Sequence, residues 1–434
     1  MTKVLCIGYY DKFTRFFLHL KKRIKQENQA ASVVVESTYF SGFLYGLIRL
    51  QSSGWLSMRA WFRAVRKKKQ YQKQLSLDKV YKGFVIDELI RYSHQKDPRM
   101  IWQTMAYIDL IENKIAGVTQ IVMIGDSRLP FEITKQWAKR KNIPIYFLEQ
   151  GPYSTTFIDQ KGVNANASIR GYKPDSVCNL KKKERVADFL QRKKNKKYLR
   201  SPLYRGLDYL YEMVCMKTAF FPPDLKIDNP VFKNLSKRVT HKALYPEEHK
   251  GKTIYLLICQ VPFDVNMTHH SPHYSSHADI LKNVHDNLPE NSLLVVREHP
   301  VYRGKYESAF YDLINRHGNI WVDFGKDFEQ VLSLANAVIV NNSTMGLEAI
   351  SKNKSVLALG NSYYDSSEIC LKMHHKNELK NQLIDVLSFR PDENRIIDFM
   401  FQFIEKQVVD GFVTDQKLIA ADAIYQQIFN NKSV

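Results

Sequence analysis

The sequence has few cysteines, and no two of them lie close together in the chain. Its five cysteines are an odd number and form no Cys-x-x-Cys motif, which argues against a disulfide framework and against structural zinc. Glycine and proline are also scarce, at 18 and 15 residues, and this excludes a fibrous or low-complexity chain. The longest apolar run of the N-terminal region, 42–48, is far shorter than the ~20 residues of a spanning helix. We expect a protein of a reducing compartment, and the short run 4–8 predicts a strand rather than a signal peptide.

Acidic residues are outnumbered by basic ones, 44 against 64, for a net charge of +20. The excess is concentrated in two segments: residues 1–75 carry 15 Lys/Arg and 3 Asp/Glu, and residues 181–206 carry 11 and 2. Such segments indicate a polyanionic partner, for example an anionic membrane surface, a nucleic acid or an acidic glycan. Solvated helix faces would explain the same charges. No nucleic-acid-binding motif accompanies them, so we expect no nucleic-acid partner.

Short apolar runs alternate with helical stretches along the chain, which is too long for one ordinary core. Strands are predicted at 4–8, 32–36, 120–124, 144–148, 253–258, 292–296, 320–322, 337–340 and 355–359. Helices are predicted at 13–25, 55–75, 131–142 and 277–288, and residues 376–434 are expected to be mostly helical. This rhythm predicts an α/β protein with two Rossmann-like domains facing a cleft, a GT-B-like architecture. The expected boundaries are 1–220, 245–390 and a helical segment 391–434 that packs back across the domains.

Polar motifs directly follow several of these strands. In open α/β sheets, ligands bind beyond the carboxyl ends of the strands, so this coincidence predicts a ligand site. The motifs are Gly125-Asp126-Ser-Arg128, Glu149-Gln-Gly151, Gln260-Val-Pro-Phe-Asp264, Arg297-Glu-His299-Pro300 and Asn342-Ser343-Thr344-Met-Gly346-Leu-Glu348.

The last of these motifs is typical of a phosphate site. Free N–H groups at a helix start favour a phosphate, and the hydroxyls of Ser343 and Thr344 add donors. Glu348, one turn in, could accept hydrogen bonds from ribose hydroxyls. Simple helix capping by Ser343 or Thr344 is the alternative. The nearby His299-Pro300 pair favours phosphate binding.

Three charged residues are candidates for chemistry on a sugar. Asp264 after its strand could act as a nucleophile or an acid/base, although capping a loop is the commoner fate of such an Asp. Glu149 in a cleft would have a raised pKa suited to acid/base work, unless it pairs with a surface lysine. Arg128 can bind a carboxylate through two hydrogen bonds, or it pairs with Asp126 or Glu149 for structure.

No Walker A, dinucleotide-binding, HExxH or GxSxG motif appears in a suitable context. Four histidines, His269, His270, His273 and His277, lie close together in the sequence, but no cysteines accompany them. We therefore expect no metal site and no cofactor.

Taken in order, these motifs resemble the capsule polysaccharide biosynthesis family of bacterial glycosyltransferases. The likeness runs from about residue 4 to residue 360 and includes Gly162-Val-Asn164, Gln260-Val-Pro-x-Asp264 and His270-Ser271-Pro. The family includes the β-Kdo transferases, which use CMP-Kdo (Kdo is 3-deoxy-D-manno-oct-2-ulosonic acid). The chain is more similar to its single-module, lipid-acceptor members than to the two-module chain extenders.

The resemblance implies a retaining transfer of Kdo, or a related acidic sugar, with Asp264 as nucleophile and Glu149 as a second catalytic residue. The acceptor would be a lipid or lipid-linked glycan, which implies a cytoplasmic enzyme at the inner face of the cytoplasmic membrane. The implied donor-binding residues are Gln260, His299, Pro300, Asn342, Ser343, Thr344, Gly346 and Glu348. The implied sugar and acceptor residues are Asp126, Arg128, Asn164, His270 and Ser271.

The chain departs from the family pattern at three points. Asn266 stands where Gln is usual, the Arg-Pro pair after Tyr153 is absent, and Asp159 lies near the expected Glu. Two alternatives therefore stay open: a transferase for another nucleotide sugar, and a non-catalytic GT-B-like protein that binds an anionic polymer.

Overall fold

The computed structural model describes residues 2–91, 97–192, 196–225, 251–262, 264–323, 325 and 327–430. The chain folds into two compact units. The first comprises residues 1–163, 193–228 and 408–434, and the second comprises 164–192 and 229–407. The expected boundaries, at 220, 245 and 391, differ from this division because the chain passes between the units more than once. Most of the expected junction at 200–250 lies outside the described residues.

The first unit is built on a seven-stranded sheet. In sheet order its strands are β15 (Val408–Asp410), β8 (Thr155–Asp159), β7 (Ile145–Gln150), β6 (Gln120–Ile124), β1 (Lys3–Gly8), β2 (Ser32–Ser37) and β3 (Gly54–Trp55). From β3 to β7 the strands are parallel, and β8 and β15 extend the sheet in antiparallel pairs. The parallel part has a Rossmann-like order, with its switch point between β1 and β6.

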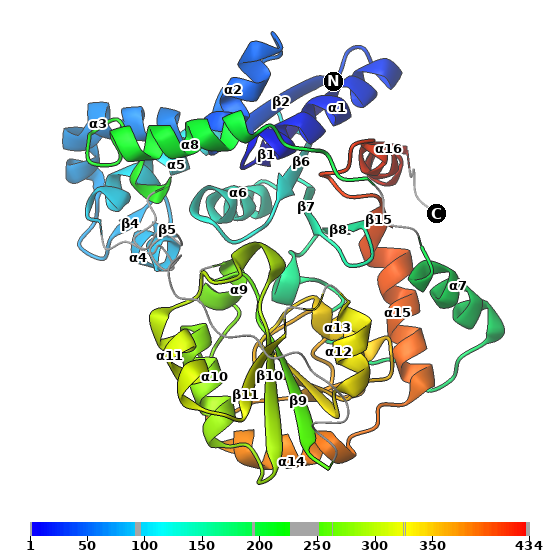
Figure 1. The fold of residues 1–434 in the computed structure, drawn as a ribbon. Helices are drawn as coiled ribbons and strands as arrows, with labels where there is room; N and C mark the ends of the chain where they lie inside the picture. Colours follow the sequence, from blue (N-terminus) through cyan, green and yellow to red (C-terminus); the bar gives the residue numbers. More distant parts are fainter. Residues whose placement is uncertain are drawn as a thin grey trace. The chain divides into compact units, whose positions relative to one another are not determined.

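Helices pack around this sheet (Figure 1). They are α1 (Asp11–Glu27), α2 (Phe40–Ile48), α3 (Leu56–Gln74), α4 (Ile86–Ile90), α5 (Arg99–Lys114), α6 (Leu129–Arg140), α8 (Pro202–Cys215) and α16 (Ile419–Tyr425), with a small hairpin of β4 (Val80–Tyr81) and β5 (Phe84–Val85). Helix α1 shows why they form: Phe13, Phe16, Phe17, Leu20 and Ile24 recur at helical spacing and are all buried. Their core also includes side chains of α16, which packs on α1.

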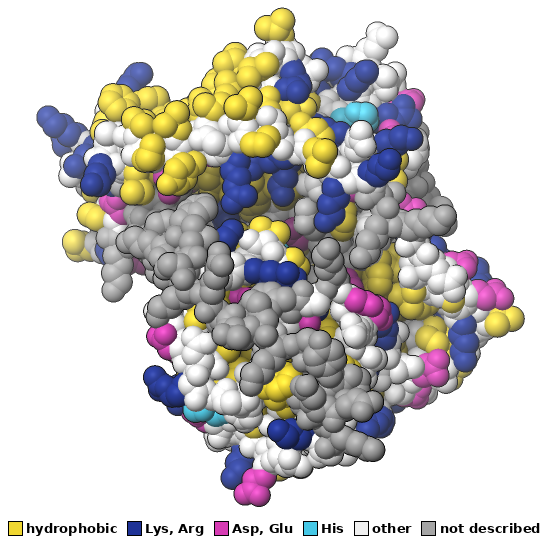
Figure 2. All heavy atoms as spheres, in the orientation of Figure 1, with side chains coloured by type: hydrophobic (Ala, Val, Ile, Leu, Met, Phe, Trp, Pro, Cys, Tyr) yellow, Lys and Arg dark blue, Asp and Glu magenta, His cyan; other side chains and the backbone are white. Residues whose placement is uncertain are grey.

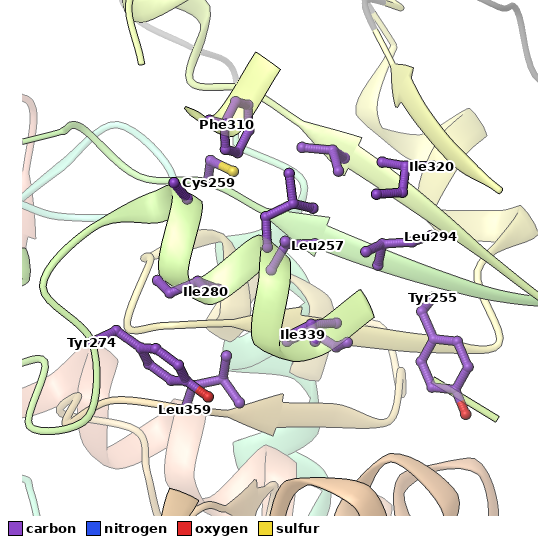
Figure 3. Close-up of a cluster of buried hydrophobic side chains, with 14 of the residues drawn as sticks. Tyr255, Leu257, Cys259, Tyr274, Ile280, Leu294, Phe310, Ile320, Ile339 and Leu359 are labelled. Carbon is purple, nitrogen blue, oxygen red and sulfur yellow. The ribbon is translucent and has the colours of Figure 1, made fainter. Parts of the chain in front are cut away.

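The second unit has a six-stranded, wholly parallel sheet. Its order is β11 (Ile320–Asp323), β10 (Ser292–Arg297), β9 (Thr253–Ile258), β12 (Ala337–Val340), β13 (Val356–Ala358) and β14 (Leu371–Lys372). The central strands are nearly continuous apolar runs, as expected for strands that are buried on both faces. Their side chains pack into the core shown in Figure 3, where Leu257, Leu294 and Ile339 come from three neighbouring strands.

Eight helices described in the second unit complete it: α7 (Leu180–Leu190), α9 (Val265–Thr268), α10 (His277–Asp286), α11 (Ser308–Arg316), α12 (Phe328–Leu334), α13 (Met345–Ile350), α14 (Leu379–Ser388) and α15 (Glu393–Gln407). The nine predicted strands and four predicted helices are confirmed to within a few residues. The prediction that residues 376–434 are mostly helical missed β15. The run Val408-Val409-Asp410 is too short to show a period, and it forms a strand because it pairs with β8.

Two Rossmann-like α/β units confirm the predicted GT-B-like fold class. Among the described residues, no helix is long and apolar enough to cross a membrane.

Candidate functional site

The predicted residues of the second unit converge at the switch point of its sheet. The strand order reverses between β9 and β12, so the loops after these strands and after β10 meet at one edge. Gln260 follows β9, His299 follows β10, and Asn342 to Glu348 follow β12. We call this edge, defined by the loops 259–271, 298–300 and 341–348, the donor edge.

Gln260 and Asn342 lie together in the interior of the donor edge. The Oε1 atom of Gln260 accepts a hydrogen bond from the backbone N–H of Asn342 (3.4 Å), and both side chains are buried. Within the described residues, the Nε2 atom of Gln260 and the Oδ1 atom of Asn342 have no hydrogen-bond partner. Buried amide groups are normally satisfied. The donor edge therefore contains one buried amide donor and one buried amide acceptor that no described residue satisfies.

Asp264 begins the short helix α9. Its Oδ1 atom accepts a hydrogen bond from the N–H of Val265 (2.7 Å). The capping role that the sequence left as an alternative is therefore present. One oxygen of a carboxylate satisfies that role, so capping does not prevent the same group from acting on a ligand.

The ring of His299 turns its Nδ1 atom toward the backbone. Its Nδ1 atom accepts the N–H of Val301 (3.3 Å), and its own backbone N–H donates to the hydroxyl of Tyr306 (2.9 Å). Burial lowers the pKa of the imidazole, and the charge of Asp264 offsets this only in part. The ring is neutral at pH 7, and Nε2–H is its donor. Pro300 follows as the first residue of a short 3₁₀ turn, where no N–H is needed.

Tyr364 holds the segment after β12 in place. The hydroxyl of Tyr364 donates to the backbone carbonyl of Ser343, and a Cβ atom at Gly346 would collide with that same hydroxyl. Gly346 is thus required for packing. Thr344 is the N-cap residue of α13 without a side-chain capping bond, whereas Ser343 Oγ accepts the N–H of Met345 at 3.4 Å. Glu348 lies in the first turn of the helix, partly buried.

His270 and Ser271 support the same edge. The carbonyl of His270 accepts hydrogen bonds from Asn342 Nδ2 (3.1 Å) and from the N–H of Asn361 (2.8 Å). Ser271 Oγ donates to the carbonyl of Tyr274 (2.7 Å). The bond from Asn342 fixes the loop after α9 against the loop after β12, and Ser271 Oγ also donates to Asn341 Oδ1 (3.4 Å). Both residues therefore position the donor edge.

In the first unit, Asp126 and Arg128 follow β6 at the switch point with β1. Asp126 is buried, and its carboxylate accepts hydrogen bonds from the Ser127 hydroxyl and from the N–H of Val163 (3.0 Å). It therefore anchors the Gly162-Val-Asn164 loop. Asn164 comes next, with a positive φ of 53°, and is grouped with the second unit.

Arg128 is exposed and lies among tyrosines that the sequence motifs did not indicate. Its Nη1 atom donates to the hydroxyl of Tyr39 (3.3 Å), and its guanidinium lies over the ring of Tyr9, 4.9 Å from the centroid. Tyr9 follows β1 and Tyr39 follows β2. Their position after strands was a usable signal. The hydrogen bond and the stacking hold the guanidinium in place, as suits a group that binds a carboxylate or phosphate.

Glu149 stands near the end of β7, partly buried, where its Oε1 atom accepts the N–H of Gln150 (2.9 Å). Lys12 lies close enough that the Glu149 charge acts on it: burial lowers the pKa of the lysine, and Glu149 partly restores it. Among the described residues, Lys12 at the start of α1 is a cation on which the charge of Glu149 acts. Arg128 and Glu149 share the carboxyl edge of the first sheet with Tyr9, Lys12 and Tyr39, and we call this the acceptor edge.

The described residues contain no group of three or more His, Cys, Asp or Glu side chains arranged to hold a metal ion. The donor edge instead offers amide, imidazole and hydroxyl groups, which bind by hydrogen bonding.

Two Rossmann-like units, each with polar side chains at the switch point of its sheet, define a protein of the GT-B-like class. The chain matches the model of the capsule polysaccharide biosynthesis protein over residues 119–384, more than half its length. It belongs to the capsule polysaccharide biosynthesis family.

The individual relatives share only a low sequence identity with the chain. The chain is 27% identical to the capsule polysaccharide export protein KpsS of Escherichia coli over 284 residues, which cover 58% of this chain and 70% of KpsS. It is 27% identical to protein FixF of Sinorhizobium fredii over 168 residues, which span 38% of this chain and only 40% of FixF. Among solved structures, the β-Kdo 2,7 transferase of Thermosulfurimonas dismutans KpsC aligns with 91% of this chain and 89% of its own, at 12% identity and a TM-score of 0.37.

Proposed function

We propose that this protein is a glycosyltransferase of capsule or surface-polysaccharide assembly that transfers Kdo, or a related acidic sugar, from a CMP-activated donor. Family membership supports the pathway. The donor and the reaction are supported by the motifs that Gln260, Asp264, His299 and Asn342–Glu348 carry. The acceptor is a lipid or lipid-linked glycan at the inner face of the cytoplasmic membrane, where the enzyme is peripherally bound.

The observation that carries the proposal is the donor edge itself. Gln260 and Asn342 present a buried donor and a buried acceptor that no described residue satisfies. Asp264 is near enough to His299 for its charge to act on the ring. A nucleotide held through the hydrogen-bonding groups of His299, Ser343 and Thr344 would bring the sugar carbon of a CMP-sugar towards Asp264. In this mechanism Asp264 attacks that carbon and CMP leaves. The acceptor hydroxyl then gives its proton to a general base, and its oxygen displaces the Asp264 carboxylate with net retention.

A thermal-shift screen of nucleotides tests the donor class. CMP should raise the unfolding temperature of the full chain, because a ligand that binds only the folded state stabilises it, whereas UDP and GDP should not. Stabilisation by UDP or GDP in place of CMP would overturn the choice of donor. Stabilisation by no nucleotide would favour the non-catalytic alternative.

A further inference from the structure

Helix α8 turns its apolar residues to solvent. None of its residues is buried, and Leu203, Met213 and Val214 are 74%, 60% and 62% exposed, with Leu210 also exposed. Leu210, Met213 and Val214 lie seven, ten and eleven residues after Leu203. At helical spacing these four side chains therefore form one stripe along the helix. In a globular protein such a stripe normally faces the core.

The polar side of α8 is the side that attaches it to the body. Asp208 accepts a hydrogen bond from the N–H of Ser41 (2.8 Å) and forms an ion pair with Arg200. Burial and the neighbouring Asp208 raise the pKa of the half-buried Glu212 above its ordinary value. Tyr211 packs against Trp55, with ring centroids 5.2 Å apart. The helix is therefore held in place with its acidic groups inward and its apolar stripe outward.

Neighbouring elements continue this apolar surface. Figure 2 shows hydrophobic side chains gathered over α8, α2 and α3. The outer apolar surface is defined by these exposed residues: Leu47, Ile48, Leu50, Phe62, Val65, Leu203, Leu210, Met213 and Val214. Exposed apolar side chains gathered in this way are typical of a surface that contacts a partner or a membrane.

The exposed charges on the same three helices are all positive. They are Arg59, Arg66, Lys68, Lys69 and Lys73 on α3 and Arg205 on α8, and Arg49 caps the end of α2. The acidic residues of α8 point inward, and α2 and α3 contain none. A symmetric pair of copies would bring these cations against one another. An anionic lipid surface would meet the apolar residues with its acyl region and the cations with its headgroups.

We propose that the outer apolar surface docks the protein on an anionic lipid bilayer and inserts its Leu, Ile, Met and Val side chains below the headgroups. The inference extends the proposed function by naming the surface that meets the membrane. It rests on that function only for the nature of the acceptor, because docking itself requires no transfer reaction.

Co-sedimentation of the full chain with vesicles tests this proposal. Wild type should bind vesicles of phosphatidylglycerol and phosphatidylcholine and keep part of its binding in high salt, because insertion is not screened. The double variant Leu210→Gln/Met213→Gln should bind roughly tenfold less or weaker still, since it removes apolar area without changing charge. The matched control Val177→Gln/Ile384→Gln changes two exposed apolar residues of the second unit and should bind as wild type does.

Both double variants should unfold at the wild-type temperature, because the four residues are exposed. Unchanged vesicle binding in Leu210→Gln/Met213→Gln would overturn the proposal. The proposal would also be overturned if sedimentation velocity showed that wild type is a dimer without lipid and that this variant is a monomer. Stabilisation by CMP should persist in the variant. If wild type binds vesicles through this surface but is not stabilised by CMP, the docking stands and the proposed donor fails.

Discussion

At the scale of single residues, Asp264 has two roles that one substitution separates. Asn is as good a helix cap as Asp, so Asp264→Asn should keep the hydrogen bond to Val265 and the fold. It removes the nucleophile, so sugar transfer should be abolished while CMP affinity stays nearly unchanged. Asp327→Asn, which alters the cap of α12 in the same unit, should leave transfer intact. Wild-type turnover in Asp264→Asn would remove this residue from the mechanism.

His299 should contribute to nucleotide affinity. His299→Ala is expected to weaken CMP binding by about 1.5–3 kcal/mol, as for a hydrogen bond to a charged group. Because burial lowers the pKa of the ring, the imidazole stays neutral above pH 7. Isothermal titration calorimetry at pH 8, well above the ordinary pKa of histidine, measures this loss. His374→Ala, at an exposed position of the same unit, is the control. Equal CMP affinity in wild type and His299→Ala would move the nucleotide elsewhere.

Single residues also show what a sequence can and cannot predict. Gln260, His299 and Asn342 could be found because each directly follows a buried apolar run, and such runs are parallel strands with a common edge. The sequence alone does not predict which residues lie beside Arg128 and Glu149. Their neighbours Tyr9, Lys12 and Tyr39 follow only from the sheet order, in which β1 lies between β2 and β6. The capping by Asp264 and the tyrosine contact that requires Gly346 depend on three-dimensional packing.

At the scale of elements, one buried carboxylate joins α7 and its preceding segment to α15. Asp398 accepts hydrogen bonds from Tyr172 (2.6 Å), the N–H of Asp175 (2.9 Å) and Lys182 (2.5 Å). Although burial alone would raise the pKa of Asp398, Lys182 and the other donors lower it below its ordinary value. Its stabilising contribution is thus present above about pH 4 and is lost as the pH falls through the lowered value.

Asp398→Asn should reduce the free energy of unfolding by about 1–3 kcal/mol, since it weakens three hydrogen bonds to a buried charge. Glu405→Gln is a matched control on the same two helices, because it removes the exposed pair with Arg185 and should cost about 0.5 kcal/mol or less. Urea denaturation at pH 7 measures both, and the difference between Asp398→Asn and wild type should vanish at strongly acidic pH. Equal stability of the two variants at pH 7 would contradict this account.

The strands and helices themselves were predictable to different degrees. Parallel strands such as β9 and β12 are continuous apolar runs, and amphipathic helices such as α1 show a clear period. Strand β8 is absent from the prediction, although its Thr, Phe and Ile are typical strand residues. The orientation of α8 was not predictable, because an apolar stripe in a sequence does not show which side packs against the body.

At the scale of the whole molecule, the two basic segments should provide the salt-sensitive part of membrane attachment. Each Lys or Arg near an anionic surface contributes about 1 kcal/mol. Replacing seven lysines by Gln should therefore lower vesicle binding and reduce the difference between binding at low and high salt. The positions are Lys67, Lys68, Lys69, Lys193, Lys194, Lys196 and Lys197, of which Lys193 and Lys194 lie outside the described residues.

Co-sedimentation with anionic and neutral vesicles measures this effect. Equal binding of wild type to both kinds of vesicle, or no loss in the Gln variant, would leave these segments as ordinary solvated surface. A residual salt-resistant component in the Gln variant is expected from the outer apolar surface.

Helix α2 links the acceptor edge to the outer apolar surface. It begins just after Tyr39, which contacts Arg128, and its last residues are Leu47 and Ile48. At 1.5 Å per residue, its nine residues span about 13 Å. The headgroup layer of a leaflet is only about 5–8 Å thick. If the end of α2 rests at the acyl boundary, the length of the helix sets how far its start, next to Tyr39 of the acceptor edge, stands above that boundary. A lipid with one small headgroup would have to be lifted partly out of its leaflet if that full height is used, whereas a lipid that already carries a sugar could reach Arg128 in place.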